Sequence, residues 1–255
     1  MLDFTLMEMP LAASEKRQPF RDARGQGSIV FDPARLRQAT PAMFDAASYG
    51  ADAQPIQGQG GRGAAWFVRG EFGDAVLRRY RRGGWMARLS DSDYLWQGED
   101  KVRSFREFTL MQRLCRAGLP VPAPIAAYYR RSGLRYRAAI LIERISDVRS
   151  FADVVGNQGL EAPWAKVGAA IARCHRHAAH HADLNAHNLL IGGNDDVWLI
   201  DWDKGRMETA AGKWCDLVLA RLERSLRKIH RDQPATLITQ GMATLREAHQ
   251  QALQA

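Results

Sequence analysis

The stretch HADLNAHNLLIGGNDDVWLIDWD, residues 181–203, decides the fold of this 255-residue chain. Two apolar runs, 189–191 and 197–200, flank a turn rich in Gly, Asn and Asp, and this pattern predicts a β-hairpin. Asp183 and Asn188 precede the first strand, and Asp201 follows the second. Because a hairpin brings these two ends together, we expect the three oxygen-bearing side chains to converge. Oxygen ligands at this density favour Mg²⁺, which usually accompanies a phosphate.

The spacing inside this stretch points to phosphoryl transfer. The order His-x-Asp-x-x-x-x-Asn, followed by an apolar strand that ends in Asp, resembles the catalytic loop and the metal-binding Asp of the protein-kinase-like fold. That resemblance implies that Asp183 accepts the proton of the attacking hydroxyl, while Asn188 and Asp201 hold Mg²⁺ on the phosphates of ATP. Any one of these residues alone would more often be a cap or a turn residue.

Charge favours an anionic partner, because the chain carries a net charge of +8 and has a pI of about 9.7. A nucleotide, a nucleic acid or an anionic lipid would each satisfy this condition. The three cysteines have neither zinc nor disulfide spacing, so we expect buried free thiols and a reducing cytoplasm. The N-terminus has no basic signal-peptide region, and no apolar run reaches the ~18 residues of a membrane span.

Four histidines lie close together in the sequence, at positions 175, 177, 180 and 181. They lack a matched set of Cys or carboxylate ligands at metal spacing, so we do not expect a zinc site. We expect His181 to brace the catalytic loop and the other three to be helix-end or surface residues.

A glycine-rich turn lies in the first half of the chain. Gly58, Gly60 and Gly63 match G-x-G-x-x-G and run into an apolar strand. The dinucleotide-binding version of this motif would open a helix instead. The kinase version folds a flap over ATP, so these glycines are candidate ATP-binding residues. A surface loop is the alternative interpretation.

The strand predicted at 75–80 lies where the kinase pattern carries a phosphate-holding Lys, and here Arg78 occupies that register. Arg can bind phosphate in a bidentate way but does not replace Lys like for like. Arg79, in the other register, is the alternative. The apolar face of 104–117 predicts a helix, and Glu107 in its first turn is the expected partner of Arg78. A first-turn acid favoured by the helix dipole is the other interpretation of Glu107.

The pattern as a whole predicts an α+β, bilobal, protein-kinase-like fold. We expect a peripheral or disordered segment at 1–27, a small, mostly antiparallel N-lobe with one main helix at 28–143, and a larger helical C-lobe at 144–255. Ala182 stands where phosphorylation-controlled protein kinases carry an Arg, and no Ala-Pro-Glu segment follows Asp201. A small molecule or a sugar is therefore a better acceptor than a protein.

Five stretches taken together resemble the 3-deoxy-D-manno-octulosonic acid (Kdo) kinases of Gram-negative bacteria: 61–68, 76–84, 105–108, 183–188 and 198–203. The resemblance implies ATP-dependent phosphorylation of the 4-hydroxyl of Kdo on a lipid A precursor, with Asp183 as the active-site residue. It also implies a peripheral protein on the cytoplasmic side of the inner membrane. The basic, aromatic residues at 81–89 and 94–96 would rest on that anionic surface, unless they form an ordinary solvated edge.

Two alternatives stay open. One is a kinase of the same fold that acts on another core sugar, such as heptose. The other is a catalytically inactive, kinase-like module that binds lipid or a partner; Arg at the Lys position suggests it, and the intact Asp, Asn and Asp set argues against it. We expect no nucleic-acid partner, because charge alone supports one and no motif does.

Overall fold

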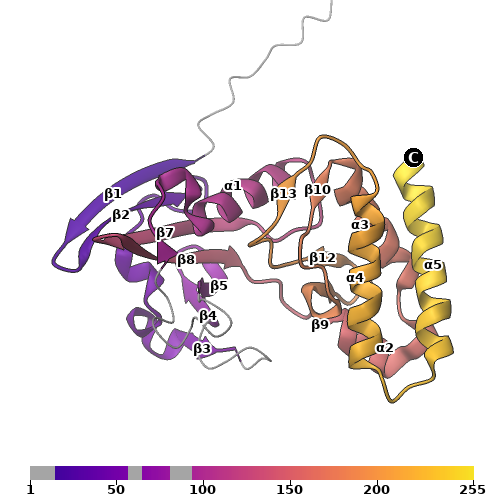
Figure 1. The fold of residues 1–255 in the computed structure, drawn as a ribbon. Coiled ribbons are helices and arrows are strands. Elements are labelled where there is room, and N and C mark those ends of the chain that lie inside the picture. The colour runs from indigo at the N-terminus through magenta and orange to yellow at the C-terminus, as the bar shows by residue number, and fades with distance from the viewer. Residues whose placement is uncertain (1–14, 57–64, 81–93) are drawn as a thin grey trace, which may run out of the picture.

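The structure, a computed structural model, describes residues 15–56, 65–80 and 94–255. It is a mixed α+β protein in which a β-sheet and one helix lie on one side and four further helices on the other (Figure 1). The sheet strands are β1 (Lys16–Asp22), β2 (Gly25–Phe31), β3 (Ala53–Pro55), β4 (Ala65–Gly70), β5 (Gly73–Arg79), β6 (Tyr94–Leu95), β7 (Pro124–Ser132) and β8 (Arg135–Glu143). Their order is β1-β2-β7-β8-β5-β4-β3, with β6 beside β8. Each pairing is antiparallel.

Helix α1 (Arg103–Arg116) covers one face of the sheet, as its apolar spacing predicts. Phe108, Met111 and Leu114 are buried on that side. The helix ends in a Schellman motif, in which the N–H of Leu119 donates to the carbonyl of Leu114 at 3.1 Å. Gly118 supplies the left-handed residue that this motif needs, with φ at 65°.

Residues 16–27 fall in the stretch predicted to be peripheral or disordered, and the structure places them in strand β1 and the first part of β2, a hairpin at the edge of the sheet. β1 carries Lys, Arg and Pro and is largely exposed, as an edge strand can be. Because it lacks an alternation of apolar and polar residues, its sequence does not predict a strand. Gly25 makes the turn possible: its φ is 135°, and a Cβ there would lie 2.3 Å from the carbonyl oxygen of Arg131.

The second half of the chain is mainly helical. Its helices are α2 (Phe151–Gln158), α3 (Trp164–Arg176), α4 (Trp214–Ile229) and α5 (Ala235–Gln254), and short 3-10 turns connect several elements, among them η6 (Ala186–Asn188). The predicted hairpin is confirmed as β11 (Leu189–Ile191) and β12 (Val197–Leu199), with β9 (Arg149–Ser150) alongside β11. A separate pair joins β10 (Ala179–His180) to β13 (Arg206–Met207). No helix of the described residues is both long enough and apolar enough to cross a bilayer.

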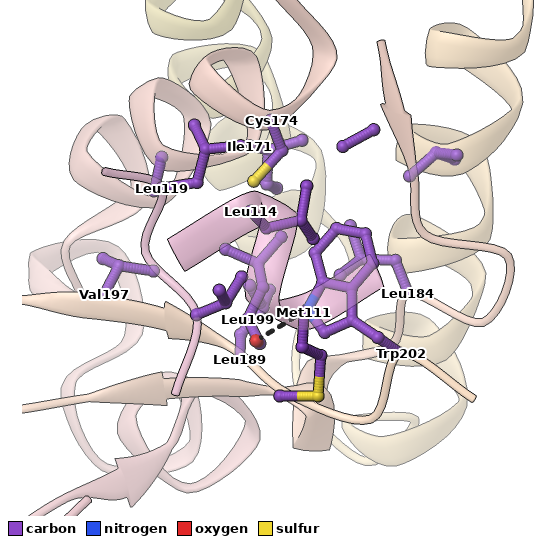
Figure 2. Close-up of a cluster of buried hydrophobic side chains, with 14 of the residues drawn as sticks. Met111, Leu114, Leu119, Ile171, Cys174, Leu184, Leu189, Val197, Leu199 and Trp202 are labelled. Carbon is purple, nitrogen blue, oxygen red and sulfur yellow. Dashed lines mark hydrogen bonds between the residues drawn. The ribbon is translucent and has the colours of Figure 1, made fainter. Parts of the chain in front are cut away.

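One buried cluster ties α1 to the hairpin, as Figure 2 shows. Met111 and Leu114 of α1 pack with Leu199 of β12 and with Trp202, whose indole N–H donates to the carbonyl of Leu199 at 3.0 Å. Trp202 is fully buried. Because it follows Asp201 directly, this packing fixes the backbone from which the Asp201 side chain departs.

His175 corrects a further prediction, since it is a core residue rather than a surface one. It is 1% exposed, and its Nδ1 lies 2.8 Å from Nε2 of His249 on α5. Its ring also packs edge-on against Trp214 of α4. Burial lowers the pKa of His175 to about 3, and burial also lowers the pKa of His249. Three helices therefore meet around neutral imidazoles.

We predict that acid destabilises the fold through His175. The unfolded side chain has a pKa near 6.5, so between about pH 6.5 and pH 3 the unfolded state binds more protons and stability falls as the pH falls. The free energy of unfolding should drop by roughly 2 kcal/mol from pH 7 to pH 5 on account of this residue. Urea unfolding of His175→Gln should show a flatter pH profile, whereas the exposed-site control His177→Gln should follow the wild type. Equal slopes in wild type and His175→Gln would contradict the prediction.

Candidate active site

His181 holds the catalytic loop against the end of the hairpin, as the sequence predicts. Its Nε2 donates to the carbonyl of Ile200 at 2.8 Å, and its Nδ1 accepts the N–H of Asp183 at 3.3 Å. Burial lowers the pKa of His181, which keeps the ring neutral in the tautomer that this pair of bonds needs. The ring thus links Asp183 to the residue before Asp201.

Asn188 closes the loop from the other side. Its Nδ2 donates to the carbonyl of Asp183 at 3.0 Å, and its own carbonyl accepts the N–H of Ile200 at 3.0 Å. Asn185 adds a third tie, because its Oδ1 caps η6 by accepting the N–H of His187. The structure thus gathers the backbones of Asp183, Asn188 and Ile200, the residue before Asp201, into one hydrogen-bonded unit, and the Oδ1 atom of Asn188 is left as a potential ligand.

Asp201 points from this unit toward the sheet. Its φ is 65°, a left-handed conformation that costs a non-glycine residue about 1–3 kcal/mol and often marks a functional position. Its Oδ1 accepts a hydrogen bond of 2.5 Å from Nη1 of Arg78 on β5. The end of the hairpin and strand β5 therefore meet directly.

Arg78 bridges two carboxylates. Its Nη2 lies 2.5 Å from both oxygens of Glu107, whose side chain is 0% exposed. The hydroxyl of Tyr80 also donates to Glu107. Burial raises the pKa of Glu107 to about 7, while the charge of Arg78 acts in the opposite direction. The predicted pairing of Arg78 with Glu107 is present, and Asp201 extends it.

Arg79 lies on the opposite face of the sheet. Its guanidinium pairs with Asp45 at 2.8 Å and stacks over Trp66. A cavity of about 1020 Å³ opens on that face, and Arg79 and Asp45 are among its lining residues. Neither Asp183, Asn188 nor Asp201 lines this cavity. Of the two candidate arginines, the structure therefore brings Arg78 to the other predicted site residues.

Two ion pairs of the site were not predicted from the sequence. Arg103, the first residue of α1, donates from Nε to Asp203 at 2.9 Å and from Nη1 to the hydroxyl of Tyr94 at 2.9 Å. A cation in the first turn opposes the helix dipole, and this was the available signal that Arg103 has an acidic partner. Arg221 on α4 pairs with Asp183, and nothing near Arg221 in the sequence indicates that contact.

The candidate metal ligands suit Mg²⁺ by chemistry. Among the described residues no cluster of three or more His, Cys, Asp or Glu is arranged to hold a metal. Asn188 and Asp201 instead offer one amide oxygen and one carboxylate, and Mg²⁺ is commonly bound through few protein oxygens, with water and phosphate completing its shell. The residues present therefore fit this ion. Gly58, Gly60 and Gly63 lie outside the described residues, as do residues 81–93.

Comparison with known proteins identifies the family. A family model described as the lipopolysaccharide kinase (Kdo/WaaP) family matches residues 49–243. The chain belongs to this family. A protein of Stenotrophomonas maltophilia (strain K279a) is 50% identical over 240 residues, which cover 94% of this chain and 96% of that relative. A protein of Xanthomonas campestris pv. campestris (strain B100) is 47% identical over the same shares of both chains. Both relatives are named 3-deoxy-D-manno-octulosonic acid kinase.

Membership in this family indicates which type of reaction the site serves. The chain is a kinase-family protein, a transferase that uses ATP, and the matched residues include Arg78, Glu107, Asp183, Asn188 and Asp201. The hairpin of β1 and β2 lies before the matched residues.

The two neighbouring arginines allow a matched test. Arg78→Lys should lower the free energy of unfolding by about 1–3 kcal/mol and reduce kinase activity, because one ammonium cannot reproduce the planar fork between two carboxylates. Arg79→Lys changes an exposed pair and should shift stability by less than about 1 kcal/mol. Urea unfolding and a phosphoryl-transfer assay measure the two effects. A larger loss from Arg79→Lys would show that the wrong arginine has been placed in the site.

Proposed function

We propose that this protein transfers the γ-phosphoryl group of ATP to the 4-hydroxyl of Kdo on a Kdo-bearing lipid A precursor, a step of lipopolysaccharide core synthesis. The observation that carries the proposal is the hydrogen-bonded unit of Asp183, Asn188 and Ile200. The next residue, Asp201, is joined through Arg78 to Glu107. The names of the two relatives support Kdo as the acceptor sugar.

We infer that the molecule is a bilobal, protein-kinase-like enzyme, with the N-lobe at 28–143 and the C-lobe at 144–255. Support comes from the antiparallel order β7-β8-β5-β4-β3 with α1 on one face, and from the separate group of helices α2 to α5 (Figure 1). Arg78 and Asp201 meet where these two parts adjoin. The hairpin of β1 and β2 extends the N-lobe sheet beyond β7.

The proposed mechanism relies on positioning and charge. Asp183 orients the sugar hydroxyl and takes its proton late in the transfer. Asn188 and Asp201 would hold Mg²⁺, and Arg78, braced by Glu107, would neutralise the phosphates, to which Gly58, Gly60 and Gly63 would also bind. Mg²⁺, when bound, offsets the negative charge of the phosphates. Because His181 and Asn188 fix the loop, the reacting groups need little rearrangement at the moment of transfer.

We also propose that the protein works as a peripheral protein on the cytoplasmic side of the inner membrane. The net charge of +8 supports contact with an anionic surface, and the acceptor itself is a lipid. In the described part of the chain, Trp96 lies beneath Arg131 beside the exposed Leu95, which is the kind of side-chain mixture that headgroups attract. Cosedimentation with vesicles that contain an anionic phospholipid tests this location; equal binding to neutral vesicles would refute it.

One assay tests the enzyme and separates it from its alternatives. Purified protein is incubated with ATP, Mg²⁺ and the Kdo-bearing lipid A precursor, and mass spectrometry looks for one added phosphate on the Kdo residue. A precursor that ends in heptose serves as the second acceptor. Phosphate on heptose alone would favour the other core sugar, and no transfer to either lipid would favour a non-catalytic module.

Asp183→Asn should lower the transfer rate by about 10²–10⁴-fold while ATP binding is retained, because the amide keeps the shape but cannot accept the proton. Asp195→Asn, in the exposed turn of the hairpin, is the matched control and should retain full activity. Nucleotide binding is measured by calorimetry and transfer by mass spectrometry. Full activity in Asp183→Asn would remove this residue from the chemistry.

A further inference from the structure

Arg221 on helix α4 forms an ion pair with Asp183, the candidate general base. Arg221 of α4 donates from Nε to Oδ1 of Asp183 at 2.9 Å, and its Nη2 contacts the same oxygen. The hydroxyl of Ser225, one turn further along, accepts the N–H of Ala186 in η6 at 3.3 Å. Helix α4 is thus anchored to the catalytic loop, so the position of Arg221 beside Asp183 follows from the fold.

The pair is open to solvent. The Arg221 and Asp183 side chains are 48% and 42% exposed, whereas the opposite face of α4 is buried through Cys215, Val218, Leu219, Leu222 and Leu226. An ion pair exposed to this degree contributes little to folding, about 0–1 kcal/mol. Both groups are therefore accessible to a ligand that approaches the catalytic loop.

The donor count leaves room for a second anion. A guanidinium has five N–H donors, and the contacts to Oδ1 of Asp183 use two of them. The described residues give the remaining three no other acceptor. The second carboxylate oxygen of Asp183 has no donor among those residues either, which suits contact with an acceptor hydroxyl. Arg221 can thus hold Asp183 and receive an anionic group of the same acceptor beside it.

We propose that Arg221 recognises the carboxylate of the acceptor sugar and so selects a sugar acid over a neutral sugar. The inference rests on the proposed function, in which the acceptor is an octulosonic acid. A planar guanidinium matches a carboxylate in a bidentate geometry, and such charge-assisted bonds are among the stronger polar contacts. A neutral acceptor such as heptose would offer the three remaining donors no negative charge and would leave them to water. The residue that contacts the base thus also determines acceptor choice.

The test compares two acceptors that differ only at the carboxylate: the Kdo-bearing lipid A precursor and its carboxyl methyl ester. Wild-type protein should prefer the acid over the ester by about 10–100-fold in kcat/KM. In Arg221→Gln the value for the acid should fall by a larger factor than the value for the ester, so that the preference for the acid is lost, while any loss from the weaker hold on Asp183 lowers both values alike. Arg221→Lys keeps the charge and should restore part of the preference.

A matched control and three outcomes make the test decisive. Arg224→Gln removes an exposed charge from the same helix and should keep the preference for the acid. An equal loss on acid and ester in Arg221→Gln would overturn the proposal, because it would mean that Arg221 only positions Asp183 or meets the phosphates. Equal wild-type rates on acid and ester would also overturn it, even if the variants failed to fold. Absence of transfer to either acceptor by the wild type would instead refute the proposed function.

Discussion

The contact of Arg78 with Glu107 and Asp201 is the interaction on which the site depends. It joins a strand, a helix and the end of a hairpin that are far apart in the sequence. Burying the Glu107 carboxylate and most of the Arg78 guanidinium is costly, and the cost is offset only when the geometry satisfies both charges. A guanidinium does this through separate nitrogens for the two carboxylates, which a single ammonium could not do. Arg at the expected Lys position is therefore compatible with an intact site.

The catalytic loop is stabilised independently of that contact. His181, Asn188 and Asn185 hold its backbone through short-range hydrogen bonds, and the buried side chain of Trp202, the residue after Asp201, fixes the backbone at that point. The loop therefore has its shape before any ligand arrives, which lowers the reorganisation that phosphoryl transfer requires. Two arginines contact this preformed unit: Arg78, from the sheet, pairs with Asp201, and Arg221, from α4, pairs with Asp183.

The parts of the molecule that have local signatures could be predicted from the sequence. The hairpin followed from two apolar runs around a polar turn, α1 from its apolar face, and the pairing of Arg78 with Glu107 from their registers in a recognised pattern. Strand β1 was not predicted because an exposed edge strand has no buried face and therefore shows no alternation of apolar and polar residues. The contacts of Arg103 and Arg221 escaped because their partners lie 100 and 38 residues away, and only the tertiary fold brings them together. The burial of His175 could not be predicted from its neighbours in the sequence, because it depends on packing against Trp214 and His249 from two other helices.

The most direct test of the central contact is a double-mutant cycle of Arg78→Gln and Glu107→Gln, measured by urea unfolding at pH 8. At that pH the Glu107 carboxyl, with its pKa near 7, is ionised in the folded protein. If the two side chains form the buried pair described, the coupling energy should be about 2 kcal/mol or more. Effects that add to within about 0.5 kcal/mol would contradict the account.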